Sequence, residues 1–222
     1  MTLASRWIGD IPVIETGSNK PRNIIVLAPL FEEANKVRRT LALLLRHLAA
    51  ADLHAVMPDL PGMGEHPAHL ETTTLSDLQD AVAKVAAALQ SSGTVIGIAS
   101  FRAGCLLDDA ADIAAHWRFA PESGDRLVRT LMRTEDATQS DETHAFVSGQ
   151  SVRRDLLDDL SAKPLSSPPL LRTVRLASDR ADADLHVPGS PLWRHAEPGE
   201  DPALARLLAE DIVTWMRSCA VS

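Results

Sequence analysis

The segment that most constrains the fold is residues 94–105, TVIGIASFRAGC, which has the pattern of a short buried strand followed by a sharp turn into a helix. Such a turn needs small residues two positions before and two positions after its crest, because the turn is strained and the strand and helix backbones pass close together. With Arg102 at the crest, these positions hold Ser100 and Gly104. With Ser100 at the crest, they hold Ile98 and Arg102, which are too bulky. The sequence therefore favours Arg102 at the crest.

Short apolar runs alternate with amphipathic segments along the chain. This alternation predicts an α/β fold, with a mostly parallel central sheet, right-handed crossovers and helices on both faces. The expected strands are residues 23–28, 54–58, 94–99, 117–120, 170–177 and 184–187. The expected helices are residues 34–51, 75–90, 103–113, 125–133, 153–162 and 201–217. The polar residues 121–166 are expected to form a small cap on one domain that spans residues 1–222.

Composition and charge exclude several classes of protein. The net charge of −8 and the absence of tyrosine argue against nucleic-acid binding. No apolar run approaches the roughly 20 residues that span a bilayer. The first ten residues lack a hydrophobic signal core, and the distant Cys105 and Cys219 form no motif, so we expect a cytoplasmic protein.

Three segments carry a resemblance to known proteins. Residues 59–65, DLPGMGE, are similar to the D-x-x-G-x-G-x-S turn of α/β-hydrolases, with His66 at the usual serine. Residues 29–39, PLFEEANKVRR, resemble the P-P-F-x-E-E-x-N-K-x-R-R loop in the second subgroup of the exosortase-system-associated hydrolase family. Residues 100–104, SFRAG, resemble the G-x-R-x-G elbow of the same subgroup, with serine for the first glycine. The resemblance implies an α/β-hydrolase fold and an association with exopolysaccharide or protein-sorting loci.

The same resemblance predicts where catalytic residues belong. In α/β-hydrolases the crest is a nucleophilic serine, an acid follows the seventh strand and a histidine follows the eighth. Here the crest is Arg102, the acid is Asp179 or Asp182, and the next histidine, His195, comes several residues late. A guanidinium stays charged and serves neither as nucleophile nor as base. We therefore expect a protein of this fold that lacks Ser-His-Asp catalysis.

Two roles are open for Arg102. A buried guanidinium needs a compensating anion. Either Glu32 or Glu33, with Asp179 or Asp182, pairs with Arg102 and fills the site, or Arg102 binds the carboxylate or phosphate of a small-molecule ligand. The candidate binding or vestigial site comprises Arg102, Glu32, Glu33, Phe31 and Phe101.

The alternative function is an active small-ester hydrolase, an esterase or thioesterase. It would use Ser100 as nucleophile with His195 and either Asp179 or Asp182. No segment has the spacing of a metal or cofactor motif, so we expect no cofactor and no metal centre. Besides an anionic small molecule, a second copy of the chain is a candidate partner.

Overall fold

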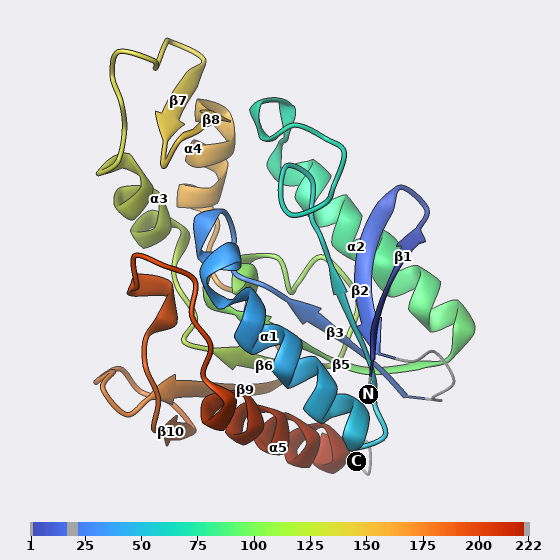
Figure 1. The fold of residues 1–222 in the computed structure, drawn as a ribbon. Coiled ribbons are helices and arrows are strands. Elements are labelled where there is room, and N and C mark those ends of the chain that lie inside the picture. The colour runs from blue at the N-terminus through green and yellow to red at the C-terminus, as the bar shows by residue number, and fades with distance from the viewer. Residues whose placement is uncertain (1, 17–21, 220–222) are drawn as a thin grey trace.

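The computed structural model describes residues 2–16 and 22–219, and these form one eight-stranded sheet and one two-stranded sheet. The large sheet has the order β1-β2-β4-β3-β5-β6-β9-β10 (Figure 1). Its pairs are parallel except β1 with β2 and β2 with β4, so the predicted mostly parallel sheet is confirmed. Its strands are β1 (Leu3–Ile8), β2 (Ile11–Thr16), β3 (Arg22–Leu27), β4 (His54–Pro58), β5 (Thr94–Phe101), β6 (Ala115–Phe119), β9 (Leu170–Leu176) and β10 (Leu185–Val187).

Helices cover both faces of the sheet, as predicted. Helices α1 (Glu32–Ala50) and α5 (Pro202–Cys219) pack together on one face, and α2 (Leu75–Ser92) lies on the other (Figure 1). Alternate residues of a strand point to opposite faces. In β3, Ile24 therefore joins the core under α1 and α5, whereas Ile25 joins the core under α2. Both faces of the central strands are buried, which explains their nearly continuous apolar sequence.

The same alternation decides where the end of β5 directs its side chains. Ile98 lies in the core on the α2 side, and Ala99 and Phe101 lie in the core on the α1 and α5 side. Ser100 follows the parity of Ile98 and is completely buried. The side chain of Ser100 is therefore directed toward the α2 side of the sheet.

The segment between β6 and β9 forms the expected small cap. It contains α3 (Gly124–Met132), β7 (His144–Val147), β8 (Gln150–Arg153) and α4 (Arg154–Ala162). Helices α3 and α4 pack on each other, and β7 and β8 form an antiparallel hairpin (Figure 1). Buried leucines of both helices, including Leu127 and Leu156, join the core on the α2 side. The cap is thus anchored to the sheet by apolar contacts.

One expected element is wrong. Residues 103–113 do not form a helix; a short 3-10 helix, η2 (Arg102–Leu106), is followed by turns. Asp108 is fully buried there and is bound by the Arg118 guanidinium, so the backbone bends to bring this carboxylate inside. The remaining short helices are η1 (Leu70–Thr72) and η3 (Leu192–Arg194).

None of the helices in residues 2–16 and 22–219 has both the length and the apolar character needed to cross a membrane.

Candidate functional site

Arg102 occupies the crest of a sharp turn between β5 and η2. Its backbone φ is +54°, a left-handed conformation that is costly for a residue with a side chain. Two positions later, a Cβ atom on Gly104 would lie 2.3 Å from the carbonyl oxygen of Ala28, so only glycine fits. Two positions earlier, Ser100 pairs with Leu27 of β3. This is the local geometry that the sequence predicts for Arg102 at the crest.

The Arg102 guanidinium is held on several sides. Its Nε and Nη2 donate to the two carboxylate oxygens of Glu33, at 3.1 and 3.2 Å, and its Nη1 donates to the Ala120 carbonyl oxygen at 3.0 Å. The guanidinium carbon lies 4.6 Å from the centre of the Trp193 ring, a cation–π contact. Only 13% of the Arg102 side chain is exposed, so the crest of the turn is filled by a fixed ion pair.

A second carboxylate, Glu122, also contacts Arg102. The Glu122 side chain is buried, and its backbone N–H donates to the Arg102 carbonyl oxygen at 3.3 Å. Neither Glu122 nor Trp193 is predicted from the sequence as a partner of Arg102. Glu122 directly follows β6, and sites in α/β folds form at the carboxyl ends of parallel strands. Its position in the sequence is therefore a signal that it belongs to the site.

Burial shifts the ionisation of this group of charges. Burial raises the pKa of Glu33 above its ordinary value, although the Arg102 charge acts in the opposite direction. Burial likewise lowers the pKa of Arg102, and Glu33 opposes that shift. The Glu33 carboxylate and the Arg102 guanidinium therefore compensate each other's charge in a partly desolvated environment. Neither side chain is free to act as a nucleophile.

The other residues of the predicted binding site lie in different surroundings. Glu32 pairs with Lys36, 3.1 Å away on the next turn of α1, and not with Arg102. Phe101 packs against Trp117 and Phe119 on the α1 and α5 side. Phe31, at the N-cap of α1, is buried and has a φ of +57°. Of this set, the structure joins Arg102 with Glu33.

Ser100 belongs to a buried polar network. Its Oγ donates to Asp108 Oδ2 at 2.9 Å and lies 3.3 Å from Cys105 Sγ. Arg118 donates to both oxygens of Asp108, at 2.7 and 2.8 Å, and also to Ser166. Burial raises the pKa of the Cys105 thiol to about 12, so Cys105 stays protonated.

The acid and the histidine of the alternative triad make contacts of their own. Asp179 accepts a hydrogen bond from Arg175 Nη1 at 2.7 Å, and His195 Nε2 is paired with Ser190 Oγ at 3.0 Å. A hydrogen bond from the Ala181 backbone lowers the pKa of Asp179, and Arg175 lowers it further. Asp182 is exposed. The structure therefore places Ser100, Asp179 and His195 in three separate hydrogen-bonded groups.

The loop after β3 has a further feature of interest. In α/β-hydrolases this loop supplies an amide to the oxyanion hole. Here the Phe31 N–H lies 3.2 Å from the Met63 sulfur, in the turn of residues 59–65. That amide already has an acceptor within the protein.

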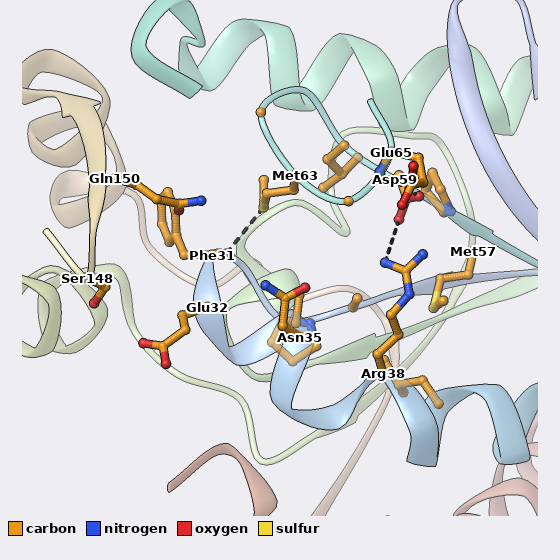
Figure 2. A pocket seen from close by; sticks show the side chains of 18 residues that line it. Phe31, Glu32, Asn35, Arg38, Met57, Asp59, Met63, Glu65, Ser148 and Gln150 are labelled. Atoms are coloured by element: carbon orange, nitrogen blue, oxygen red, sulfur yellow. Dashed lines mark hydrogen bonds and ion pairs between the residues drawn. The ribbon is translucent and has the colours of Figure 1, made fainter. Parts of the chain in front are cut away.

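A cavity of about 470 Å³ lies beside the elbow, between the start of α1 and the turn of residues 59–65 (Figure 2). Figure 2 shows Asn35 and Arg38 of α1 facing this turn, with Gln150 of β8 at one end. Arg38 lies 3.6 Å from Asp59, and the Asp59 carboxylate also accepts the Glu65 N–H. Two of the three segments behind the family resemblance, residues 29–39 and 59–65, thus meet around one polar cavity.

Two more cavities lie over the elbow itself, with volumes of about 690 and 370 Å³. Both are lined by Arg102, Glu122 and Trp193, together with arginines of α3 and η3. Neither cavity is lined by Ser100 or His195. Within the described ranges, no three His, Cys, Asp or Glu side chains are grouped so that they could hold a metal ion.

Comparison with solved structures identifies the fold. The chain is similar to Est1E from Butyrivibrio proteoclasticus with ferulic acid bound (TM-score 0.66, 14% identity, covering 99% of this chain and 100% of that one). It is also similar to the metagenome-derived lipolytic enzymes LipS and LipT (TM-score 0.60, 12% identity, covering 90% of this chain and 94% of that one). A third similar structure is mouse alpha/beta hydrolase domain-containing protein 10 (TM-score 0.59, 12% identity, covering 98% of this chain and 99% of that one).

These likenesses extend over nearly the whole chain and show that it has the α/β-hydrolase fold, as the sequence predicts. No family model and no curated protein matches the sequence.

Proposed function

We propose that this chain is a binding protein of the exosortase-associated hydrolase type that has the α/β-hydrolase fold and lacks Ser-His-Asp catalysis. One observation carries the proposal. Arg102 occupies the nucleophile position at a φ of +54° and is fixed there by Glu33, with Glu122 and Trp193 also in contact. An arginine cannot attack an ester carbonyl, because it has no nucleophilic lone pair at ordinary pH.

The other catalytic parts support the same proposal. A triad needs hydrogen bonds from the histidine to both nucleophile and acid, at about 2.6 to 3.2 Å. Ser100 instead binds Asp108 on the α2 side of the sheet, and His195 binds Ser190. The Phe31 N–H, which would donate to the substrate oxygen in an oxyanion hole, contacts the Met63 sulfur instead.

The assignment to the exosortase-associated type rests on the sequence. The loop at residues 29–39 and the elbow at residues 100–104 carry it. The proposal includes one domain over residues 1–222 and a cytoplasmic location.

The test is reaction of the purified full chain with p-nitrophenyl acetate and with a fluorophosphonate probe. We expect no hydrolysis above the buffer rate and no covalent adduct by mass spectrometry. The matched control is Ser100→Ala, which should behave identically in both assays. An adduct on Ser100 that is lost in Ser100→Ala would establish the alternative, a small-ester hydrolase that uses Ser100 with His195 and Asp179 or Asp182.

A further inference from the structure

An unusual number of arginines surround the filled elbow. The two cavities above it, which share residues and which we call the arginine cleft, are lined by Arg102 and six further arginines. The acids that line the cleft number only three, in a protein whose net charge is −8. The six arginines are Arg126, Arg129, Arg133, Arg175, Arg180 and Arg194. The three acids are Glu33, Glu122 and Asp179. The cleft is thus a local concentration of positive charge on an acidic molecule.

One wall of the cleft consists of arginines that helical spacing places on the same face of α3. Arg126 and Arg129 of the cap helix α3 and Arg133, its C-cap residue, are three and four residues apart, so they lie on one face of the helix. Leu127 and Leu131 of the same helix are buried in the core, which fixes how the helix is turned. The arginine face is therefore held toward the cleft by the packing of the opposite face.

The charges of the cleft are unequally compensated. Arg102 has Glu33 and Glu122, and Arg126 shares Glu122 at 3.3 Å. Arg133 and Arg194, in contrast, make no ion pair with any described residue, although both line the larger cavity. Arg180, which lines the smaller cavity, is likewise exposed and makes no ion pair with a described residue, so three guanidinium groups on different segments remain available to a ligand.

We propose that the arginine cleft binds a small polyanion, a molecule with at least two phosphate or carboxylate groups. Guanidinium groups bind such oxyanions through paired hydrogen bonds, and they remain charged at every physiological pH. Two anionic groups are needed because Arg133 lies at the end of α3 whereas Arg194 lies in η3, after β10. The site is at the carboxyl edge of the parallel strands, where open α/β sheets bind their ligands.

The size and the net charge favour a small molecule. The larger cavity, about 690 Å³, is in the range of pockets for cofactor-sized ligands. The overall charge of −8 opposes long nucleic acids, whose phosphates would extend beyond the cleft. This inference deepens the proposed function and rests on it. Both require that Arg102 forms the floor of a binding site and is not part of a defective catalytic centre.

The experiment is isothermal titration calorimetry of the full chain at low salt, with inorganic pyrophosphate and, separately, with citrate. We expect saturable binding of at least one of the two. The double variant Arg133→Gln, Arg194→Gln should weaken that binding by about 100-fold, roughly tenfold for each charged hydrogen-bonding group. The control is Arg206→Gln, an exposed arginine of α5 that pairs with Glu210 outside the cleft and should not change binding.

The pattern of outcomes decides the proposal. Binding of pyrophosphate alone identifies a phosphate ligand, and binding of citrate alone identifies a polycarboxylate. No binding of either probe, or equal binding by the double variant and by Arg206→Gln, would overturn it. Binding of a glutamate-rich peptide in the absence of binding by both small anions would also overturn it, in favour of a protein partner. The fluorophosphonate result is independent, so esterase activity would refute the proposed function without deciding whether the cleft binds anions.

Discussion

Ser100 Oγ donates a 2.9 Å hydrogen bond to Asp108 Oδ2, and that carboxylate also receives two hydrogen bonds from Arg118. All three side chains are buried. The serine nearest the crest of the elbow is therefore part of a structural network on the α2 side of the sheet. Arg102, two residues later, faces charged partners from α1 and from the segment after β6. The turn between β5 and η2 thus contributes Ser100 to one polar group and Arg102 to another.

The first prediction concerns the buried Asp108. In Asp108→Asn the Arg118 guanidinium stays in place, because only 3% of its side chain is exposed. It loses the negative charge that compensates it. Removing one partner of a buried ion pair costs about 3 to 5 kcal/mol, and we expect this loss in the free energy of unfolding measured with urea. The control Ser100→Ala removes only a neutral donor and should cost about 1 kcal/mol. Equal costs for the two variants would contradict the role given to Arg118.

The second prediction is the pH dependence that Asp108 produces. Burial by itself raises the pKa of Asp108, but the neighbouring His116 and Arg118 outweigh burial and hold the pKa below its usual value. A carboxyl with a lowered pKa in the folded state stabilises the fold above its unfolded pKa of about 3.9, and this contribution is lost as the pH falls toward the folded value. Urea unfolding below about pH 4 should show this loss. Asp108→Asn should have a shallower slope over that range, and an unchanged slope would assign the effect to other carboxylates.

The sequence predicts the local elements well and the site only in part. Strand β4 lies where it is expected, at residues 54–58, because periodicity and flanking turns are local signals. The helix expected over residues 103–113 is absent, because the apolar spacing there has the helical period while the buried Asp108 requires a bend. Either Glu32 or Glu33 is foreseen as a partner of Arg102, since the loop after the third strand lies above the elbow, and the structure has Glu33 in that role. The arginines of α3 are not foreseen, because only the folding of the cap over the sheet brings them there, and Glu122 is not foreseen although its place after β6 is a signal for it.

The third prediction tests the geometry of the elbow through Gly104. In Gly104→Ala the new Cβ atom would lie 2.3 Å from the Ala28 carbonyl oxygen, so the strand and η2 must move apart. We expect a loss of about 1 to 3 kcal/mol in the free energy of unfolding, the usual cost of forced packing. The matched control is Gly149→Ala in the β7–β8 turn, where nothing lies within 4 Å and only the positive φ of +80° is unfavourable. Gly149→Ala should cost about 1 kcal/mol, and a Gly104→Ala variant as stable as the parent protein would show that the two backbones are not in close contact.

The fourth prediction is that a serine placed at the crest does not produce catalysis. Arg102→Ser places a hydroxyl at the crest, but His195 is paired with Ser190 and Asp179 with Arg175. Without a histidine positioned to accept its proton, the new hydroxyl should give no burst of p-nitrophenol from p-nitrophenyl acetate and no fluorophosphonate adduct. Arg102→Ala is the control for unspecific effects of emptying the site. An adduct that Arg102→Ser forms at the crest and Arg102→Ala lacks would mean that a base is within reach after all.

The fifth prediction separates two adjacent glutamates of α1. Glu33 receives two hydrogen bonds from Arg102, and 20% of its side chain is exposed, whereas Glu32 forms a surface pair with Lys36 and is 50% exposed. Glu33→Ala leaves the partly buried guanidinium with Glu122 as its remaining carboxylate partner, so we expect a loss of about 1 to 3 kcal/mol in the free energy of unfolding. Glu32→Ala should change it by less than about 0.5 kcal/mol, as for other exposed helical pairs. Equal losses for Glu33→Ala and Glu32→Ala would show that the ion pair between Glu33 and Arg102 does not stabilise the fold.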